Sequence, residues 1–92
     1  MADVRVGMLG SGFIGTFHAL GLRHAPNTRV AVNYGAGPER RDAFARQFGS
    51  RPADSIEAVC ADPEVDLVVI SLPNQLHLEA VRAATSRGKA VS

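Results

Sequence analysis

Three glycines near the start of the chain have the spacing of a turn that holds a diphosphate. Residues Gly10, Ser11, Gly12, Phe13, Ile14 and Gly15 match the pattern G-x-G-x-x-G. In such a turn the first glycine permits a tight bend after a strand, the second lets the backbone approach a pyrophosphate, and the third lets a helix pack closely on the strand. The free N–H groups at the start of that helix also attract an anion. We therefore predict that residues 10–15 bind the pyrophosphate of a dinucleotide.

The residues at the end of the second predicted strand help to decide whether the site is suited to NAD or to NADP. An NAD-binding fold usually has an acid about 20 residues after the glycines, where it holds the ribose hydroxyls. Residues 32–35 (Val-Asn-Tyr-Gly) contain no acid. Without an acid, the 2′-phosphate of NADP is not repelled, and Arg40 or Arg41 could neutralise its charge, which favours NADP. The alternative for each arginine is a solvated position on the helix surface without a role in binding. The alternative is NAD, with Asn33 hydrogen-bonded to the ribose and Tyr34 packed near the adenine.

A third candidate segment, Ser71, Leu72, Pro73 and Asn74 with His77, follows the most apolar run of the chain. Ligands of open parallel sheets bind beyond the carboxyl ends of the strands, so we expect this segment to line the path of the nicotinamide ribose. We expect Asn74 to cap the next helix and His77 to lie in its first turn. Taken alone, His77 is better explained as a partly exposed residue at the helix start without a role.

Alternating strands and helices must position these segments. Strand-like runs occupy residues 4–9, 29–33, 66–71 and 89–91, with a short extended piece at 50–53. In residues 13–24 the apolar side chains Phe13, Ile14, Phe17 and Leu20 recur at helical spacing. Further helices are indicated at residues 38–48, 54–61 and 74–87. In the second of these, Asp54 and Glu57 are expected to form a capping box, and the buried stripe is expected to consist of Ile56, Val59 and Cys60. This alternation predicts an α/β fold with a doubly wound parallel sheet, Rossmann-like.

The composition describes one small globular domain. The chain has 92 residues, 46% of them hydrophobic, and a formal net charge of +1. This balance gives no electrostatic reason to expect a nucleic acid or an anionic membrane as a partner. No signal peptide is visible, and the longest apolar run, residues 67–70, is too short to span a bilayer. Cys60 is the only cysteine and shows no metal-ligand spacing to the histidines, so we expect no zinc site and a reducing cytoplasm.

The chain resembles the N-terminal domain of the glucose–fructose oxidoreductase / inositol dehydrogenase / MocA family. The resemblance covers nearly the whole chain and rests on residues 6–15, 38–40, 62–66, Pro73-Asn74 with His77, and 88–91. It implies that Gly10, Gly12 and Gly15 hold the pyrophosphate of NAD(P). It also implies that Pro73, Asn74 and His77 line the cleft near the nicotinamide.

The resemblance further implies hydride transfer to or from a sugar, a polyol or a related alcohol or carbonyl compound. In this family a Glu-Lys-Pro motif follows the last strand, and its lysine and a histidine or aspartate of a second domain serve in catalysis. Residues 1–92 are thus expected to be the dinucleotide-binding domain alone, truncated at the last strand, without catalytic residues or the substrate domain. Two alternatives are a non-catalytic nucleotide-binding fragment and a methyltransferase-like domain for S-adenosylmethionine.

Self-association is the last expectation from the sequence. The strand that starts at Lys89 would be short and lie at a sheet edge, and one apolar face would lack its usual cover. Exposed edges and apolar patches favour contacts between chains. We therefore expect a homo-oligomer, or marginal stability as a monomer.

Overall fold

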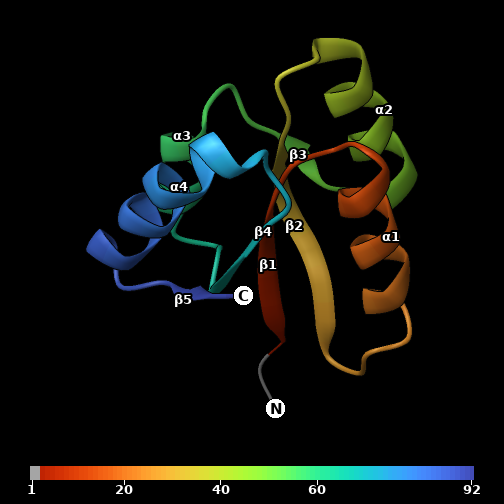
Figure 1. The fold of residues 1–92 in the computed structure, drawn as a ribbon. Coiled ribbons are helices and arrows are strands. Elements are labelled where there is room, and N and C mark those ends of the chain that lie inside the picture. The colour runs from red at the N-terminus through yellow and green to blue at the C-terminus, as the bar shows by residue number, and fades with distance from the viewer. Residues whose placement is uncertain (1–2) are drawn as a thin grey trace.

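Five parallel strands form the centre of the structure, a computed structural model that describes residues 3–92 (Figure 1). The elements in chain order are β1 (Val4–Leu9), α1 (Phe13–Leu22), β2 (Thr28–Tyr34), α2 (Pro38–Phe48), β3 (Arg51–Pro52), α3 (Ile56–Ala61), β4 (Leu67–Ile70), α4 (Asn74–Ser86) and β5 (Ala90–Val91). The strand order is β3-β2-β1-β4-β5. The chain winds outward from β1 to β3 and then returns to the other side of β1, which confirms the doubly wound α/β class.

Helices cover both faces of the sheet. In Figure 1, α1 and α2 lie on one side and α3 and α4 on the other. Met8 and Leu9 of β1 are completely buried but belong to different apolar clusters, one on each face. The central strand is therefore covered on both sides, which explains its continuous apolar sequence. The predicted stripe of α3 is also confirmed, since Ile56, Val59 and Cys60 are all buried.

The helix ends follow their capping residues, with two corrections to the sequence analysis. As predicted, α2 begins at Pro38 and ends at Gly49, which has a left-handed conformation with a φ of 71°. The predicted capping box of α3 is wrong, because the Ser55 side chain accepts the hydrogen bond from the Ala58 N–H. Asn74 does not cap α4: it is the first helical residue, and the capping position belongs to Pro73.

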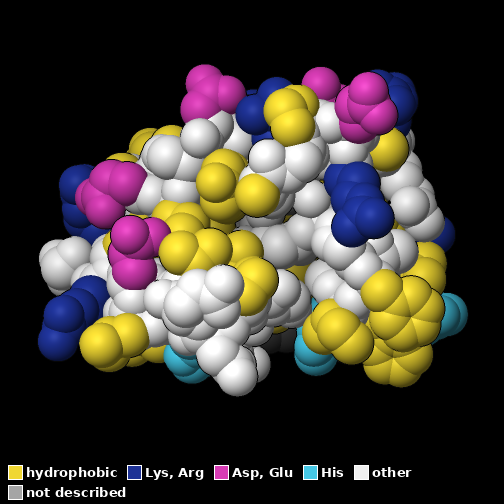
Figure 2. Space-filling model, turned by 45° about the horizontal axis from the view of Figure 1, so that its top comes forward, with side chains coloured by type: hydrophobic (Ala, Val, Ile, Leu, Met, Phe, Trp, Pro, Cys, Tyr) yellow, Lys and Arg dark blue, Asp and Glu magenta, His cyan; other side chains and the backbone are white. Residues whose placement is uncertain are grey.

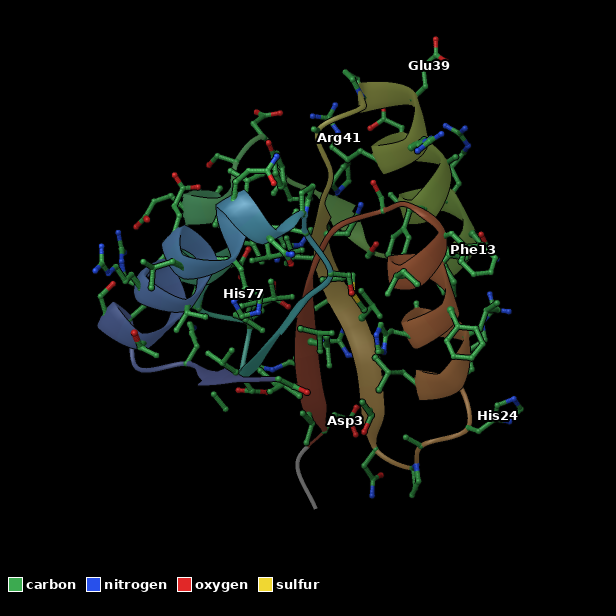
Figure 3. All side chains as sticks on the ribbon, viewed as in Figure 1. Asp3, Phe13, His24, Glu39, Arg41 and His77 are labelled. Carbon is green, nitrogen blue, oxygen red and sulfur yellow. The ribbon has the colours of Figure 1, made fainter. Side chains whose placement is uncertain are left out.

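The apolar side chains of α1 face outward rather than toward the sheet. Phe13, Phe17 and Ile14 are 83%, 67% and 55% exposed, while Gly15 and Ala19 are the buried residues of the helix. With a rotation of about 100° per residue, positions 13 and 17 lie opposite positions 15 and 19. Figure 3 shows Phe13 directed away from the sheet, and Figure 2 shows hydrophobic side chains gathered over α1. Helical spacing alone predicted the helix but not which face is buried.

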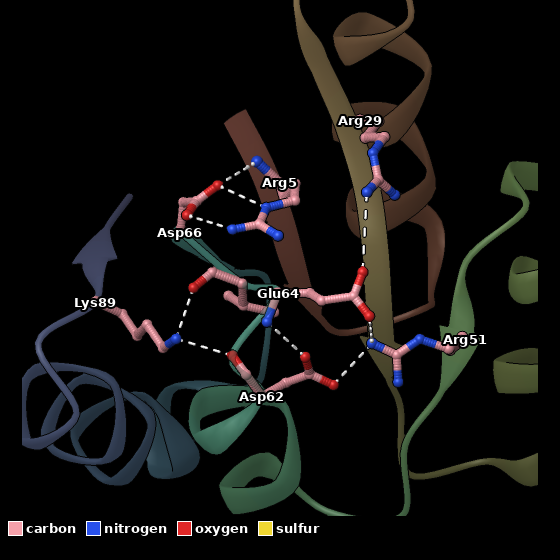
Figure 4. A network of polar contacts seen from close by, with 8 residues as sticks. Arg5, Arg29, Arg51, Asp62, Glu64, Asp66 and Lys89 are labelled. Carbon is pink, nitrogen blue, oxygen red and sulfur yellow. Dashed lines mark hydrogen bonds and ion pairs between the residues drawn. The ribbon is translucent and has the colours of Figure 1, made fainter. Parts of the chain in front are cut away.

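An ion-pair network joins the amino-terminal ends of the strands (Figure 4). Arg5 pairs with Asp66 at 3.2 Å, and Arg51 pairs with Asp62 at 2.9 Å. The Lys89 ammonium donates to the backbone carbonyls of Asp62 and Val65 at 2.8 and 2.6 Å. These contacts hold the sheet together at one end and leave the carboxyl ends of the strands for a binding site. Among residues 3–92, no helix has the length and apolar character needed to cross a membrane.

Candidate functional site

The glycine turn lies where three strands end together. The Gly10 N–H donates to the Tyr34 carbonyl at 2.6 Å, and the Ser71 N–H donates to the Leu9 carbonyl at 2.7 Å. These two bonds join the carboxyl ends of β2 and β4 to the end of β1. The crevice at this point, between strands whose connections run in opposite directions, is the usual ligand position of a doubly wound sheet.

Two of the three glycines are required by the fold itself. Gly10 has a φ of +110°, and a Cβ there would lie 2.4 Å from the Ser71 carbonyl oxygen. A Cβ on Gly15 would lie 2.2 Å from the Gly10 carbonyl oxygen, because the first turn of α1 lies directly against the glycine turn. Any side chain at these positions would force the backbone apart.

Gly12 differs, because the fold does not demand a glycine there. Its φ of −83° and ψ of −160° are extended, and a Cβ would meet no atom within 4 Å. The Cβ would instead project into open space at the start of α1, where helix N–H groups lack partners within the helix. A bound diphosphate supplies the reason for a glycine here, since a side chain would occupy its place.

Ser71 adds a polar atom that lacks a partner. Its Oγ is buried and has no hydrogen bond with any part of the chain that the structure describes. Most buried polar side-chain atoms in proteins have a partner, so this hydroxyl is an exception. Ser71 lies at the end of β4 next to Gly10. The hydroxyl therefore has an unused hydrogen-bonding capacity beside the glycine turn, and this turn with its open space at Gly12 fits a bound dinucleotide.

Ser11 fills the space at the end of the second strand. A Cβ on Gly35 would lie 1.8 Å from the Ser11 Oγ and 3.2 Å from the Ser11 backbone nitrogen, so a side chain at this position would require Ser11 to move. Gly35 stands 20 positions after Gly15 (35 − 15 = 20), the distance at which an acid usually binds the ribose. The spacing from Gly15 is the signal in the sequence that points to Gly35, besides the missing acid.

The two neighbouring arginines, Arg40 and Arg41, have different surroundings in the structure. Arg40 lines an open pocket of about 310 Å³ together with Ser11 and Gly12. The Arg41 guanidinium instead contacts Asp42 at 3.1 Å and Asp54 at 3.2 Å. Arg40 is therefore the cation that shares a pocket with the glycine turn, whereas a phosphate would have to compete with two carboxylates for Arg41.

Asn33 does not face the crevice, which corrects its predicted role as a ribose ligand. Its side chain is completely buried. The Nδ2 group donates to the backbone carbonyl of Arg41 at 3.1 Å, and Oδ1 accepts from the Ser50 hydroxyl at 2.6 Å. Both ends of the amide are engaged inside the protein, so a ribose cannot reach it.

The remaining predicted residues lie around the same edge. Tyr34 ends β2, is half-buried, and lines a pocket of about 310 Å³ with residues of α3 and α4. Leu72 packs against the core cluster on that face. Pro73, Asn74 and His77 are exposed at the start of α4. Figure 3 places His77 on the side of β4 away from α1 and Phe13. The glycine turn and the start of α4 thus both lie at the carboxyl edge of the sheet, after β1 and β4 respectively.

This arrangement of a five-stranded parallel sheet, a glycine turn after the first strand and an open space above Gly12 defines a Rossmann dinucleotide-binding domain. The chain belongs to the oxidoreductase family of glucose–fructose oxidoreductase, inositol dehydrogenase and MocA, whose NAD-binding Rossmann profile matches residues 4–92. It corresponds to the NAD(P)-binding domain of that family.

Known members of the family are similar over nearly the whole chain. The inositol 2-dehydrogenase of Rhizobium meliloti is 32% identical over 88 residues, which are 96% of this chain and 26% of that protein. The levoglucosan dehydrogenase of Pseudarthrobacter phenanthrenivorans is 35% identical over 98 residues, covering 97% of this chain and 25% of that one. A solved levoglucosan dehydrogenase in complex with NADH and levoglucosan has a TM-score of 0.89 at 31% identity, covering 97% of this chain and 26% of its own.

A crystal structure of biliverdin reductase from Synechocystis, in complex with biliverdin and NADP+, is equally similar. It has a TM-score of 0.89 at 38% identity and covers 96% of this chain and 28% of its own. The present chain spans about a quarter of the length of the curated relatives it matches.

Proposed function

We propose that this chain binds NADP as the cofactor domain of an oxidoreductase that acts on a sugar, a polyol or a related alcohol or carbonyl compound. One observation supports this most strongly: of the three glycines in the turn, Gly12 alone has no structural reason to be glycine. Membership in the oxidoreductase family favours this function over a methyltransferase that uses S-adenosylmethionine.

Each part of the site has a separate task in this proposal. The amides at the start of α1, next to Gly12, bind the diphosphate, and the Ser71 hydroxyl donates a further hydrogen bond in the crevice. Ile14, Leu72, Pro73, Asn74 and His77 line the path toward the nicotinamide, and Tyr34 lies near the adenine. When bound, the nicotinamide accepts or supplies the hydride. The chain itself binds and orients the cofactor, and catalytic groups are expected outside residues 1–92.

The preference for NADP rests on Arg40. Relatives include one protein solved with NADP+ and another solved with NADH, so the family does not decide the cofactor. In this chain no carboxylate stands at the end of β2, and Arg40 shares a pocket with Ser11. A guanidinium can donate two parallel hydrogen bonds to a phosphate. The NAD alternative is weaker, because the Asn33 amide that it requires is already engaged.

The substrate class follows from the relatives rather than from this chain. Two of them are dehydrogenases of inositol and of levoglucosan. A cytoplasmic location suits the single cysteine, Cys60, which is buried as a free thiol.

Calorimetric titration of the chain with NADPH and NADH tests the proposed cofactor site. We expect NADPH to bind more tightly, and Gly12→Val to weaken both cofactors at least tenfold, about 1.4 kcal/mol. Gly21→Val on α1 is the matched control, because a Cβ there also meets no atom within 4 Å. Unchanged binding by Gly12→Val would place the cofactor elsewhere. Turnover is not expected from the chain alone.

We also propose that two copies of the chain associate through the outward face of α1. None of the residues from Phe13 to Leu22 is an acid, a lysine or an arginine, so two such faces do not repel each other. An exposed phenylalanine presents roughly 150–250 Å² of surface, so the face offers on the order of 400 Å² in each copy. A symmetric contact plus its rim approaches the ~1,000 Å² of a weak but specific interface.

A further inference from the structure

Two buried polar side chains lie between the sheet and α2. Among residues 3–92 the buried polar residues are Asn33 and Ser50, and they bind each other: the Ser50 hydroxyl donates to Asn33 Oδ1 at 2.6 Å. Burying an amide is unfavourable unless it is hydrogen-bonded. An apolar side chain would fill the same space without this requirement, so the asparagine invites an explanation beyond packing.

The bonds of Asn33 reach both ends of α2. Its Nδ2 group donates to the carbonyl of Arg41, in the first turn of the helix, at 3.1 Å. Ser50 follows Gly49, the residue that ends the helix. Asn33 therefore links the first turn of α2 and, through Ser50, the segment after its last turn to β2, in addition to the apolar packing of Phe44 and Ala45. Unlike apolar contacts, these hydrogen bonds have preferred directions and so help to define the position of the helix.

The first turn of α2 carries the cation of the proposed site. Arg40 precedes Arg41 and lines the pocket that also contains Ser11 and Gly12. Asn33 does not line that pocket. Its influence on a ligand must therefore pass through the backbone of the helix, which sets where the Arg40 guanidinium can reach.

We infer that Asn33 is a positioning residue for cofactor selection, holding the first turn of α2 so that Arg40 faces the 2′-phosphate of NADP. The inference rests on the proposed function and adds the residue that maintains the selectivity of the site. It assigns Asn33 a role without any contact to the cofactor. The quantity it controls is the preference for NADPH over NADH, rather than dinucleotide binding as such.

The decisive variant replaces both polar partners. Asn33→Leu combined with Ser50→Ala removes the amide and the hydroxyl that bind each other, so that only the Arg41 carbonyl loses a donor. Replacing both partners of a buried hydrogen bond by apolar groups can be nearly neutral for stability. Calorimetry of the 92-residue chain measures the ratio of the NADH to the NADPH dissociation constant. We expect this ratio to fall about three- to tenfold, because a charge-assisted hydrogen bond from Arg40 becomes poorly aligned.

Three further variants separate positioning from general loss of structure. Ser50→Ala alone keeps the bond to Arg41 and is expected to keep the ratio. Val59→Ala disturbs the core cluster on the other face and is expected to weaken the fold without altering the ratio. With Arg40→Gln already present, the double variant should change the ratio no further, since interacting residues are not additive.

The outcomes distinguish this inference from the proposed function. A double variant that remains folded by circular dichroism and keeps the wild-type ratio overturns the role of Asn33. Equal binding of NADPH and NADH by the wild type also overturns it, while leaving a dinucleotide site in place. A wild type that binds neither cofactor overturns the proposed function itself. If the double variant does not fold, Asn33→Ser, whose hydroxyl is too short to reach Arg41, must lower the ratio instead.

Discussion

At the scale of single residues, the three glycines of the turn have different physical reasons to be glycine. Gly10 has a positive φ, which favours glycine. At Gly15 the Gly10 carbonyl oxygen leaves no room for a Cβ, whereas a Cβ on Gly12 would project into open space. Fold and ligand binding are therefore separable within six residues. A substitution at one position tests the architecture, and a substitution at another tests the site.

The first prediction concerns Gly15. Gly15→Ala should lower the free energy of unfolding by about 1–3 kcal/mol, because its Cβ would press on the Gly10 carbonyl and displace α1. Urea denaturation followed by circular dichroism measures the change. Gly21→Ala is the control, since Gly21 lies in the same helix and a Cβ there would meet no atom within 4 Å. Equal stability of the two variants would contradict the close approach of α1 to the turn.

Residue types and spacing predicted the glycine turn because all its members are local and follow a strand. The role of Asn33 could not be predicted in the same way. Residues 30–33 of β2 are all buried, so alternation along the strand does not reveal which way a side chain points. Its partner Ser50 is 17 positions away, and the other partner is a backbone carbonyl that carries no sequence signal.

At the scale of elements, the order and type of helices and strands followed from the sequence, whereas the orientation of α1 did not. Periodicity finds a helix that has two unlike faces, but it assumes that the apolar face is the buried one. In α1 the close approach at Gly15 admits only small residues such as Ala19 on the inner side. The large apolar side chains are therefore on the outside.

The ion pairs at the amino-terminal ends of the strands (Figure 4) predict that the stability of the fold decreases at acidic pH. Hydrogen bonds from the Arg5 side chain and backbone N–H lower the pKa of Asp66. Burial alone would raise the pKa of Asp62, but the Glu64 N–H and the Arg51 guanidinium lower it overall. A lowered pKa in the folded state stabilises the protein above the ordinary value of about 3.9, and this contribution is lost as the pH falls below it.

We therefore expect the free energy of unfolding to be steady between roughly pH 7 and 5 and to decline below about pH 4. Asp66→Asn should flatten part of this decline, as measured by urea denaturation at several pH values. Glu79→Gln, on the exposed surface of α4, should leave the pH profile as it is. An identical acid profile in wild type and Asp66→Asn would show that the Arg5–Asp66 pair does not contribute.

At the scale of the whole molecule, the outward face of α1 predicts concentration-dependent association. Sedimentation equilibrium should show an apparent mass that rises with concentration, because apolar surface is removed from water on contact. Phe17→Glu should keep the chain monomeric by placing a charge in the middle of the face. Leu78→Glu on α4 is the control, since Leu78 is 58% exposed but lies on another helix. A monodisperse wild-type monomer at high concentration would rule out this contact.

The position of Tyr34 has a practical consequence for spectroscopy. The chain contains one tyrosine and no tryptophan. When the exciting light is chosen at wavelengths that the four phenylalanines do not absorb, the ultraviolet emission comes from this one ring at the end of β2, close to the expected nucleotide. Quenching of that emission then reports events at this edge of the sheet without an attached label.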